Sequence, residues 1–562
     1  MDTKVNQNEI IKANSRYLRG TLEESIADAA TGALSADDAQ ISKFHGFYEQ
    51  DDRDLRLQRQ EQFLEPYYSF MLRARLPGGV CTPEQWLTID SVCRELSNGS
   101  IRLTTRQTFQ YHGILKKNLK PLIQRINQVM IDSIGGCGDV NRNVICNSNP
   151  ECSSLHAEVY RWAKRISEHL LPETRAYHEI WLDGKQLAGD ESEPLYGKTY
   201  LPRKFKTAVA IPPYNDVDVY TNDLGFVAIA DDGRLQGFNV LAGGGMGTTH
   251  DDPSTYPRLA DVLGFIKPEQ TLAVAEAVIT TQRDFGDRIS RRHARLKYTI
   301  ERMGPDAFIK EVEKRAEMRF EEPHPVSFIS QGDRYGWAGN ADGKSHLTLY
   351  IENGRVENRP DAEQLNGLYK IAQIHKGDFR ITPNQNLIVA SVPDGMKQEI
   401  EGIARHHGLL YEGGSPTRLA SIACVAMPTC PQAMAEAERY FPDLLQKVDR
   451  LADYHGIREN AIVMRMTGCP NGCARPFVAE IGLVGKGPGR YNLLLGGDGS
   501  GLRLNRLYRK NLNEAELLNT LDGLFQQYAA KRNPDERFGD YVIRSGLVRP
   551  VIYPKEDYHG TD

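Results

Sequence analysis

Two parts of this sequence carry the same series of features in the same order, and this repetition restricts the fold more than any other property. Each copy has a strand-like run, a helix pattern and a second β-rich run, the latter at residues 101–112 in the first copy and 379–389 in the second. Each copy continues with two cysteines separated by five residues, then a helix pattern, at 154–170 and 432–448, and then a glycine-bearing stretch. This shared order predicts two diverged copies of one unit, related by pseudo-twofold symmetry.

Runs of Val, Ile and Phe alternate with long helix patterns, which predicts an α+β fold with mixed α/β character. At about 150 residues per domain, 562 residues are enough for three or four domains. We expect a ferredoxin-like half from each copy, paired about the pseudo-twofold, and two larger α/β cofactor-binding domains. We expect an N-terminal arm or partner-binding extension at residues 1–65 and the paired ferredoxin-like domain at residues 66–135 plus 336–409. A first-copy cofactor and substrate domain is expected at residues 136–335, and a second-copy cofactor domain at residues 410–562.

The composition argues against several classes of function. With 69 Lys and Arg against 74 Asp and Glu, the formal net charge is −5, which is too small to indicate a nucleic-acid or anionic membrane partner. The chain has no long uncharged apolar run, so we expect no membrane span. The N-terminal residues lack the apolar stretch of a secretory signal, and we therefore expect a cytoplasmic protein.

Four cysteines of the second copy form the strongest chemical signal. Cys424 and Cys430 are followed, after 38 intervening residues, by Cys469 and Cys473, and a proline follows both Cys430 and Cys469. Four thiolates from two short loops are what a [4Fe-4S] cluster requires, because each iron takes one sulfur ligand from the protein. Gly472 permits the tight turn that directs Cys473 towards the same centre. The spacing therefore predicts an iron-sulfur cluster.

Two other interpretations of these cysteines remain open. A structural zinc site also uses four thiolates, although zinc sites mostly have two residues between paired cysteines. Unligated core cysteines are the second alternative. The first copy has the pair Cys146 and Cys152 but no second pair, so we expect these two to be structural. At the place that we match to the second cysteine loop, the first copy offers the cations of residues 203–206.

Together these motifs resemble those of the sirohaem-dependent nitrite and sulfite reductases. The resemblance covers nearly the whole chain, and besides the cysteine pattern it rests on six strings: residues 17–21, 50–54, 75–79, 139–143, 200–207 and 486–493. It implies that Cys473 binds one iron of the cluster and, through the same sulfur, is the axial ligand of the sirohaem iron. Ala474 departs from the family pattern, which often has glycine after this cysteine, but no ligand is lost by the change.

The resemblance also implies which residues bind the cofactor and the substrate. Sirohaem carries eight carboxylates and needs a cationic, donor-rich pocket. The expected sirohaem contacts are Arg102, Thr104, Arg106, Gln110, His112, Arg203, Asn471 and Cys473. The expected sulfite-binding cations, which also supply protons while oxygen leaves as water, are Arg73, Arg142, Lys204 and Lys206.

The resemblance implies six-electron reduction of sulfite to sulfide in sulfur assimilation and cysteine biosynthesis. A ferredoxin-linked nitrite reductase is the nearest alternative, but in those relatives asparagine typically replaces the second lysine, so Lys206 favours sulfite. A non-catalytic iron-sulfur electron carrier is a further alternative, and it would not need the substrate cations. The sequence has no convincing Gly-x-Gly-x-x-Gly motif after a strand, so electrons must come from another chain. The N-terminal strings favour an NADPH-dependent flavoprotein (alpha) subunit over ferredoxin as that donor.

Overall fold

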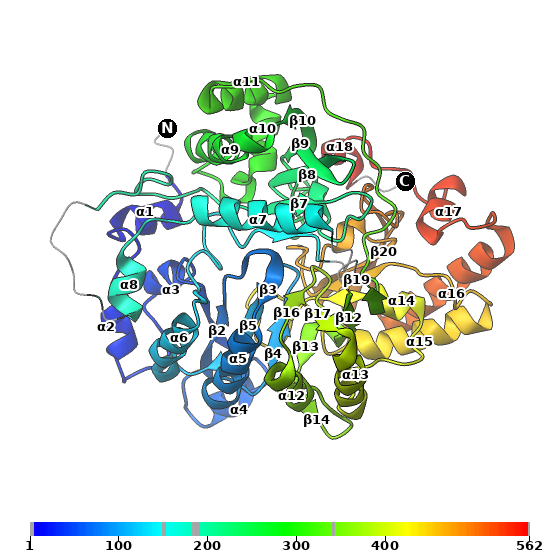
Figure 1. Ribbon diagram of the computed structural model, residues 1–562, viewed down its shortest axis with the longest axis horizontal. Helices are drawn as coiled ribbons and strands as arrows, with labels where there is room; N and C mark the ends of the chain where they lie inside the picture. Colours follow the sequence, from blue (N-terminus) through cyan, green and yellow to red (C-terminus); the bar gives the residue numbers. More distant parts are fainter. Residues whose placement is uncertain (1–4, 149–152, 183, 185–190, 340–342, 560–562) are drawn as a thin grey trace.

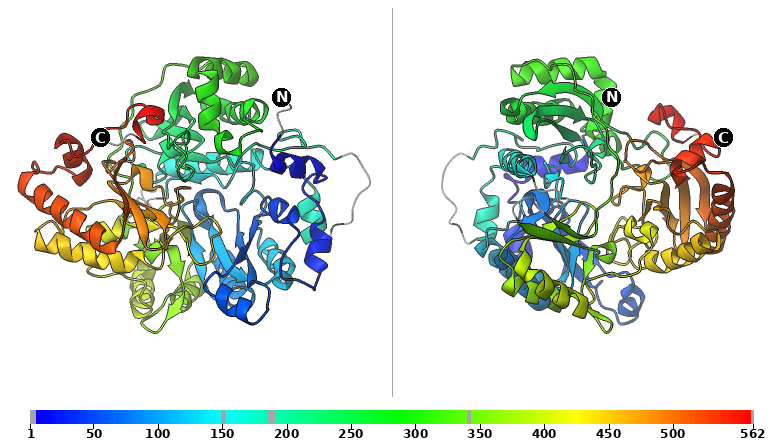
Figure 2. Two further views of the ribbon diagram at one scale, coloured as in Figure 1. Left: turned by 180° about the vertical axis from the view of Figure 1, so that it is seen from behind. Right: turned by 45° about the vertical axis from the view of Figure 1, so that its right-hand side comes forward.

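The computed structural model describes residues 5–148, 153–182, 184, 191–339 and 343–559. Three lobes are visible in Figure 1. The paired half-domains lie at the bottom, the first-copy domain lies above them, and the second-copy domain lies to the right. Figure 2 shows the same three lobes from behind and from one side. One apolar core runs through the N-terminal segment, both half-domains and the first-copy domain, and the second-copy domain has its own core.

The two half-domains repeat the same order of elements. The first is built from β2 (Tyr68–Arg73), α5 (Pro83–Leu96), β4 (Ile101–Leu103), β5 (Phe109–Ile114) and α6 (Leu119–Gln128). The second is built from β12 (Lys344–Leu349), α12 (Gln364–Ile374), β16 (Asp378–Ile381), β17 (Leu387–Pro393) and α13 (Lys397–His406). The α+β class and the internal repeat predicted from the sequence are thus confirmed.

Each half-domain also gives a strand to the sheet of the other. Strand β3 (Val80–Cys81) pairs with β16 of the second half-domain, and β13 (Arg355–Val356) pairs with β4 of the first. Strand β11 (Gly336–Gly339) forms the far edge of the second sheet, and β14 (Asn358–Arg359) pairs with β15 (Ala362–Glu363) in a small ribbon. Because backbone hydrogen bonds cross in both directions, the two half-domains form a single folding unit.

The two larger domains share one sheet topology. The described residues of each domain form a five-stranded sheet in which two parallel pairings are followed by two antiparallel pairings. In the first-copy domain the strands are β6 (Ile145–Cys146), β7 (Thr207–Ala210), β8 (Leu224–Asp231), β9 (Arg234–Ala242) and β10 (Asp261–Ile266). In the second-copy domain they are β18 (Ile422–Ala423), β19 (Met464–Thr467), β20 (Ile481–Gly487), β21 (Arg490–Leu495) and β22 (Arg506–Leu512).

Further helices accompany both of these sheets. Those of the first-copy domain are α7 (Ser154–His169), α8 (Ala176–Trp181), α9 (Thr271–Phe285), α10 (Leu296–Met303) and α11 (Pro305–Ala316). Those of the second-copy domain are α14 (Pro416–Leu419), α15 (Phe441–Tyr454), α16 (Glu514–Lys531), α17 (Phe538–Arg544) and α18 (Pro554–Asp557). Helix α8 packs instead on α6 of the first half-domain and on Phe47 of the N-terminal segment. None of the helices in the described ranges is both long enough and apolar enough to cross a membrane.

The N-terminal segment that we expected as an extension is packed on the rest of the chain. Its elements are α1 (Gln7–Asn14), α2 (Leu22–Ala27), α3 (Asp38–Ile41), β1 (Phe47–Asp51) and α4 (Arg56–Glu61). Strand β1 pairs with β2 and so becomes the edge strand of the first half-domain's sheet.

The helix predicted at 154–170 is present as α7. The prediction of a helix at 432–448 is wrong for the first half of that range. Helix α15 begins only at Phe441, with Pro442 in its first turn. The backbone N–H groups of Met434 and Ala435 instead donate to Gly468 O, at 2.8 and 3.1 Å. This segment therefore supports the neighbouring cysteine loop, and that tertiary contact prevails over its helix-forming composition.

The contact between the half-domains depends on Trp86 of α5. Its side chain has no exposed surface, and its ring lies between Phe109 at 5.6 Å and Phe379 of the other half-domain at 5.0 Å, measured between ring centroids. We predict that Trp86→Ala lowers the free energy of unfolding by about 3–5 kcal/mol, the usual cost of removing a large buried ring. The partly exposed Trp337 on edge strand β11 provides the control, since Trp337→Ala should cost less. Equal thermal unfolding midpoints for the two variants would refute the special role of Trp86.

Candidate active site

Two loops of the second-copy domain bring the four predicted cluster cysteines together. The first loop follows β18 and carries Cys424 and Cys430, and the second follows β19 and carries Cys469 and Cys473. Backbone contacts join the loops: Cys424 N donates to Met466 O at 3.2 Å, and Gly468 N donates to Cys424 Sγ at 3.3 Å. The parallel strands β18 and β19 thus deliver both pairs of thiols to the same edge of the sheet.

The turn between Cys469 and Cys473 requires glycine, as the sequence predicts. Gly472 has a φ of +63°, and a Cβ atom there would lie 2.7 Å from the ring of Phe477. At Gly468 a Cβ atom would lie 2.5 Å from Ala435 O, the carbonyl of the segment that packs against this loop. A side chain at Gly468 would push the two cysteine loops apart, because the Cβ atom of Ala426 in the first loop also lies 2.5 Å away, and a side chain at Gly472 would displace the second loop from Phe477.

The electrostatics of the four thiols fit a metal cluster. Burial raises the pKa of Cys424 well above its ordinary value, and the charges of Cys473 and Cys469 raise it further. Burial and Cys473 likewise raise the pKa of Cys469 to about 12 and raise that of Cys430. In the described part of the chain no three of these side chains converge on one metal position, but the thiols interact electrostatically. Thiolates in such a group repel one another unless a cation neutralises them, and bound iron deprotonates such thiols outright. The donor set therefore suits a [4Fe-4S] cluster held by these four residues.

A cavity of about 580 Å³ adjoins the second cysteine loop. Of the predicted site residues, it is lined by Arg203, Lys204, Asn471 and Cys469. The other cationic side chains that line it are Lys12, Lys43, Arg291, Arg292 and Arg295, whereas its only carboxylate among the described residues is Asp139. Lys12, Arg291 and Arg292 are paired with Glu9, Asp139 and Asp252. The remaining cations still leave the wall positive, which suits a polyanion such as a macrocycle bearing many carboxylates.

The lysines beside the cavity have lowered pKa values. Burial, with the charges of Arg295 and Arg203 nearby, lowers the pKa of Lys204 well below its ordinary value. Burial, together with Arg295 and Arg106, lowers the pKa of Lys206 to about 7. The charge of Cys473 acts on both lysines in the opposite direction. The two lysines therefore lie between a group of arginines and the cysteine loop, where their protons are held less tightly.

Arg73 and Arg142 are brought together around a cysteine to which sequence reasoning gave no role. Arg73 Nη1 lies 3.3 Å and Arg142 Nη2 lies 3.4 Å from Cys137 Sγ, and this thiol is buried. The orientation of the Gln110 amide that satisfies its hydrogen bonds has its oxygen accepting from Arg73 Nε at 3.0 Å. Tyr48 is close to both arginines and also lines the cavity. These contacts fix the two guanidinium groups next to the cation-rich wall.

Several of the expected sirohaem contacts bind protein groups instead of pointing into this cavity. Arg102 donates to Ala423 O at 2.9 Å, directly before Cys424, and pairs with Glu438 at 3.1 Å. Arg106 donates to Asn222 Oδ1 at 2.7 Å and to Thr207 O at 2.9 Å, and so joins the first half-domain to the first-copy domain.

The remaining expected sirohaem contacts on these strands are Thr104 and His112. The hydroxyl of Thr104 accepts from the Arg106 backbone N–H at 3.2 Å. Both ring nitrogens of His112 are buried without a hydrogen-bond partner. The assignment of these residues as sirohaem contacts stays a prediction.

The match between the first-copy cations and the second cysteine loop is wrong. Arg203 and Lys206 precede β7, whereas the second cysteine loop follows the equivalent strand β19. The true counterpart of that loop is the segment after β7, which ends at Asp218. The cations nevertheless reach the cysteine loop, because the two domains face each other. Cys146 is buried on β6, while Cys152 lies outside the described residues.

Sequence reasoning also missed Arg295, which among the neighbouring charges lowers the pKa values of Lys204 and Lys206 most. It precedes α10, lines the cavity, and has a buried Nη1 without a hydrogen-bond partner, 4.0 Å from Asp223. Sequence spacing gives no signal for Arg295, since it lies 89 positions after Lys206 in the chain. Only the fold brings the two residues near each other. Besides the number of cations, the unpartnered Nη1 donor of Arg295 is a second feature of the cavity wall that fits an anionic cofactor.

Family models match both kinds of domain. A model described as the nitrite and sulphite reductase 4Fe-4S domain matches residues 161–320, and one described as the nitrite/sulfite reductase ferredoxin-like half domain matches residues 64–129 and 339–406. A Thiocapsa roseopersicina protein named sulfite reductase (NADPH) hemoprotein beta-component is 66% identical over 560 residues, with 100% of both chains covered. The chain belongs to the nitrite and sulfite reductase family.

Other members of this family extend the comparison. A Shewanella piezotolerans protein with the same name as the Thiocapsa protein is 59% identical over 563 residues, again with 100% of both chains covered. Among solved structures, that of the Mycobacterium tuberculosis NirA protein has a TM-score of 0.78 and 23% identity, covering 97% of each chain. At this identity the structural likeness shows a common fold and nothing more.

The lowered pKa of Lys206 predicts how stability depends on pH in the cofactor-free protein. In the unfolded chain this lysine titrates near 10.5, and in the folded protein near 7. Above pH 7 the unfolded chain therefore holds a proton that the folded protein lacks, so the free energy of unfolding should rise with pH. Between pH 7 and about 8.5, below the titration of exposed thiols, thermal unfolding midpoints should rise less steeply in Lys206→Met. An unchanged slope would contradict the buried location of this lysine.

Proposed function

We propose that this chain is the haemoprotein component of an NADPH-dependent assimilatory sulfite reductase, which reduces sulfite to sulfide with six electrons. The observation that carries the proposal is the cation-lined cavity beside the loop of Cys469 and Cys473. It places anion-binding side chains next to the donor set of an iron-sulfur cluster. The names of the two full-length relatives, at 66% and 59% identity, agree with it.

In this proposal the four cysteines hold a [4Fe-4S] cluster, and the Cys473 thiolate is also the axial ligand of sirohaem. The two cofactors together supply electron storage and the redox chemistry. Arg203 and Asn471, which line the cavity, would bind the carboxylate-bearing macrocycle, with Arg295 as an additional cation. The exposed position of Cys473, in contrast to the buried Cys469, supports a ligand that serves two neighbours.

The substrate is bound by Arg73, Arg142, Lys204 and Lys206. Sulfite carries up to two negative charges, and removing it from water requires several cations. The arginines stay protonated and hold the anion. The lysines, whose pKa values are lowered, can transfer protons near neutral pH while the three oxygens leave as water. A bound anion favours the protonated form of each lysine.

Electrons come from a separate NADPH-dependent flavoprotein subunit, because the sequence contains no evident nucleotide-binding motif of its own. This role places the chain in the cytoplasm, in sulfur assimilation and cysteine biosynthesis.

The function is tested by turnover of the anaerobically purified protein with reduced methyl viologen as an artificial donor. We expect one sulfide for every six electrons consumed and an absorption spectrum of sirohaem. A protein that contains a cluster but neither binds sirohaem nor forms sulfide would instead be an electron carrier.

The bridging role of Cys473 predicts the effect of one conservative substitution. Cys473→Ser should lower sulfite turnover by more than about a hundredfold, because a neutral hydroxyl is a poor ligand for both irons. Electron-paramagnetic resonance should show that the coupling between haem and cluster is lost. Cys146→Ser provides the control, since Cys146 lies in the other copy and should leave the coupling intact. Normal turnover by Cys473→Ser would refute the bridge.

Lys206 should distinguish sulfite from nitrite. Lys206→Asn removes a charged hydrogen-bond donor worth about 1.5–3 kcal/mol, so kcat/KM for sulfite should fall roughly 10- to 100-fold. Nitrite carries a single negative charge and should lose less. Parallel steady-state kinetics on the two anions measure the difference, and equal losses would remove Lys206 as the residue that sets the preference.

A further inference from the structure

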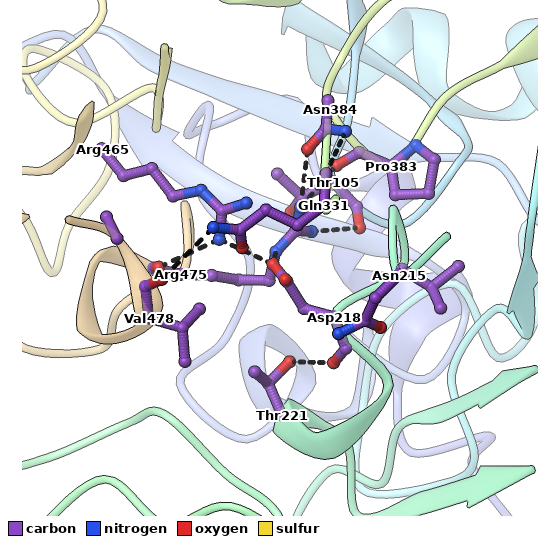
Figure 3. Close-up of polar contacts among 12 residues, drawn as sticks. Thr105, Asn215, Asp218, Thr221, Gln331, Pro383, Asn384, Arg465, Arg475 and Val478 are labelled. Atoms are coloured by element: carbon purple, nitrogen blue, oxygen red, sulfur yellow. Dashed lines mark hydrogen bonds and ion pairs between the residues drawn. The ribbon is translucent and has the colours of Figure 1, made fainter. Parts of the chain in front are cut away.

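A buried ion-pair network lies where the domains meet, and neither the cluster nor the substrate proposal uses it. The carboxylate of Asp218 in the first-copy domain accepts from Arg475 Nε at 2.5 Å and from Arg465 Nη1 at 2.6 Å, both from the second-copy domain. All three side chains are buried, and the exposed fraction of Asp218 is 0%. Figure 3 shows the two guanidinium groups converging on this one carboxylate.

Asp218 and Arg475 occupy the same position in the two copies. They are 257 residues apart in the chain, and the same interval separates the starts of β7 and β19 and of β8 and β20. Both have left-handed backbone conformations, with φ of 45° and 55°, directly before a short helical turn. The two copies have thus acquired opposite charges at one equivalent position, and these charges pair across the pseudo-twofold axis.

Arg475 extends this pairing to both half-domains. Its Nη2 donates to Pro383 O and Asn384 Oδ1, each at 3.1 Å, and its Nη1 donates to Thr105 O at 3.4 Å. Thr105 and Pro383 are equivalent residues in the repeated turns between β4 and β5 and between β16 and β17. One guanidinium group therefore joins all four repeated parts of the chain, as Figure 3 shows.

The network also reaches Cys473. Arg475 follows this cysteine by two residues, its carbonyl accepts from Arg465 at 3.3 Å, and Thr105 Oγ1 donates to Cys473 O at 3.1 Å. We propose that Asp218 is a positioning residue that, through Arg475 and Arg465, fixes the Cys473 turn relative to the cation-lined cavity of the opposite domain. This inference rests on the proposed role of Cys473 as a cluster ligand.

The buried charges of the network fix the geometry of the groups that it joins, beyond any contribution to the stability of the fold. Two guanidinium groups share the Asp218 carboxylate, and the carboxyl groups of Asp216 and Asp333 also interact electrostatically with Arg475. Buried ion pairs of this kind are poor stabilisers compared with apolar packing. They do impose one geometry on the groups that they join, and a displacement of about 1 Å at a reacting centre can cost a hundredfold in rate. Neutralising Asp218 should therefore change both the orientation of the Cys473 turn and the potential at the cluster.

The test compares Asp218→Asn with Glu352→Gln in the full-length protein loaded with its cofactors. Glu352 pairs with Arg418 between the second half-domain and the second-copy domain, but this pair has no contact with the Cys473 turn. Arg475→Lys is the second variant. It keeps the charge and the pairing with Asp218, but it cannot reach both half-domain turns at once. For each protein we measure the electron-paramagnetic resonance spectrum and the reduction potential of the cluster. We also measure kcat and KM for sulfite with reduced methyl viologen as the donor.

We expect Asp218→Asn to shift the potential and spectrum of the cluster and to lower kcat roughly tenfold or more, with KM within about twofold because the substrate cations are untouched. Glu352→Gln should match the wild type. If Asp218→Asn does not yield folded protein, Arg475→Lys decides by the same readouts. A folded variant with wild-type spectrum, potential and kcat would overturn the positioning role alone, whereas a wild-type protein without a cluster would overturn it together with the proposed function.

Discussion

The structure depends on four cysteine thiols brought to one edge of the second-copy sheet, three of which lie where they resist ionisation. Burial and mutual repulsion raise the pKa values of Cys424, Cys430 and Cys469, so these groups become good ligands only when a cation neutralises them. Neither cysteine loop could keep this arrangement alone. Gly468, the segment at 433–438 and the parallel pair β18 and β19 hold the loops against each other. The family relationship makes an iron-sulfur cluster the cation that fits this set.

The opposite domain supplies the complementary charge. Its cations cluster on the cavity wall beside Cys469, where they depress one another's pKa values, as Lys204 and Lys206 show. Concentrating so many cations costs free energy in the absence of an anion, and in the proposed function a polyanionic cofactor and an anionic substrate would relieve that cost. The two copies have thus diverged in opposite directions, one towards thiols and the other towards cations. Their pseudo-twofold packing brings the two kinds of group together. At one equivalent position the two copies likewise carry opposite charges, Asp218 in the first and Arg475 in the second, and these two residues pair.

Much of this arrangement could be predicted from the sequence, because it depends on local residue patterns and on the internal repeat. The repeated β-rich runs predicted the two half-domains, and the cysteine spacing predicted loops that the structure does bring together. The exchange of β3 and β13 between the half-domains could not be predicted, since strand pairing at a distance leaves no local pattern. The segment at 433–438 has a helical composition, but its backbone hydrogen bonds go to the cysteine loop. Arg295 and Cys137 have no motif, and only the fold brings them to the site.

The most direct test of this account is the metal content of the anaerobically purified protein, measured as iron, zinc and acid-labile sulfide per chain together with X-ray absorption at the iron edge. One cluster and one haem iron predict about five irons for every four labile sulfides, with iron-iron scattering typical of a cubane and no zinc. A colourless protein that contains zinc and no labile sulfide would contradict it.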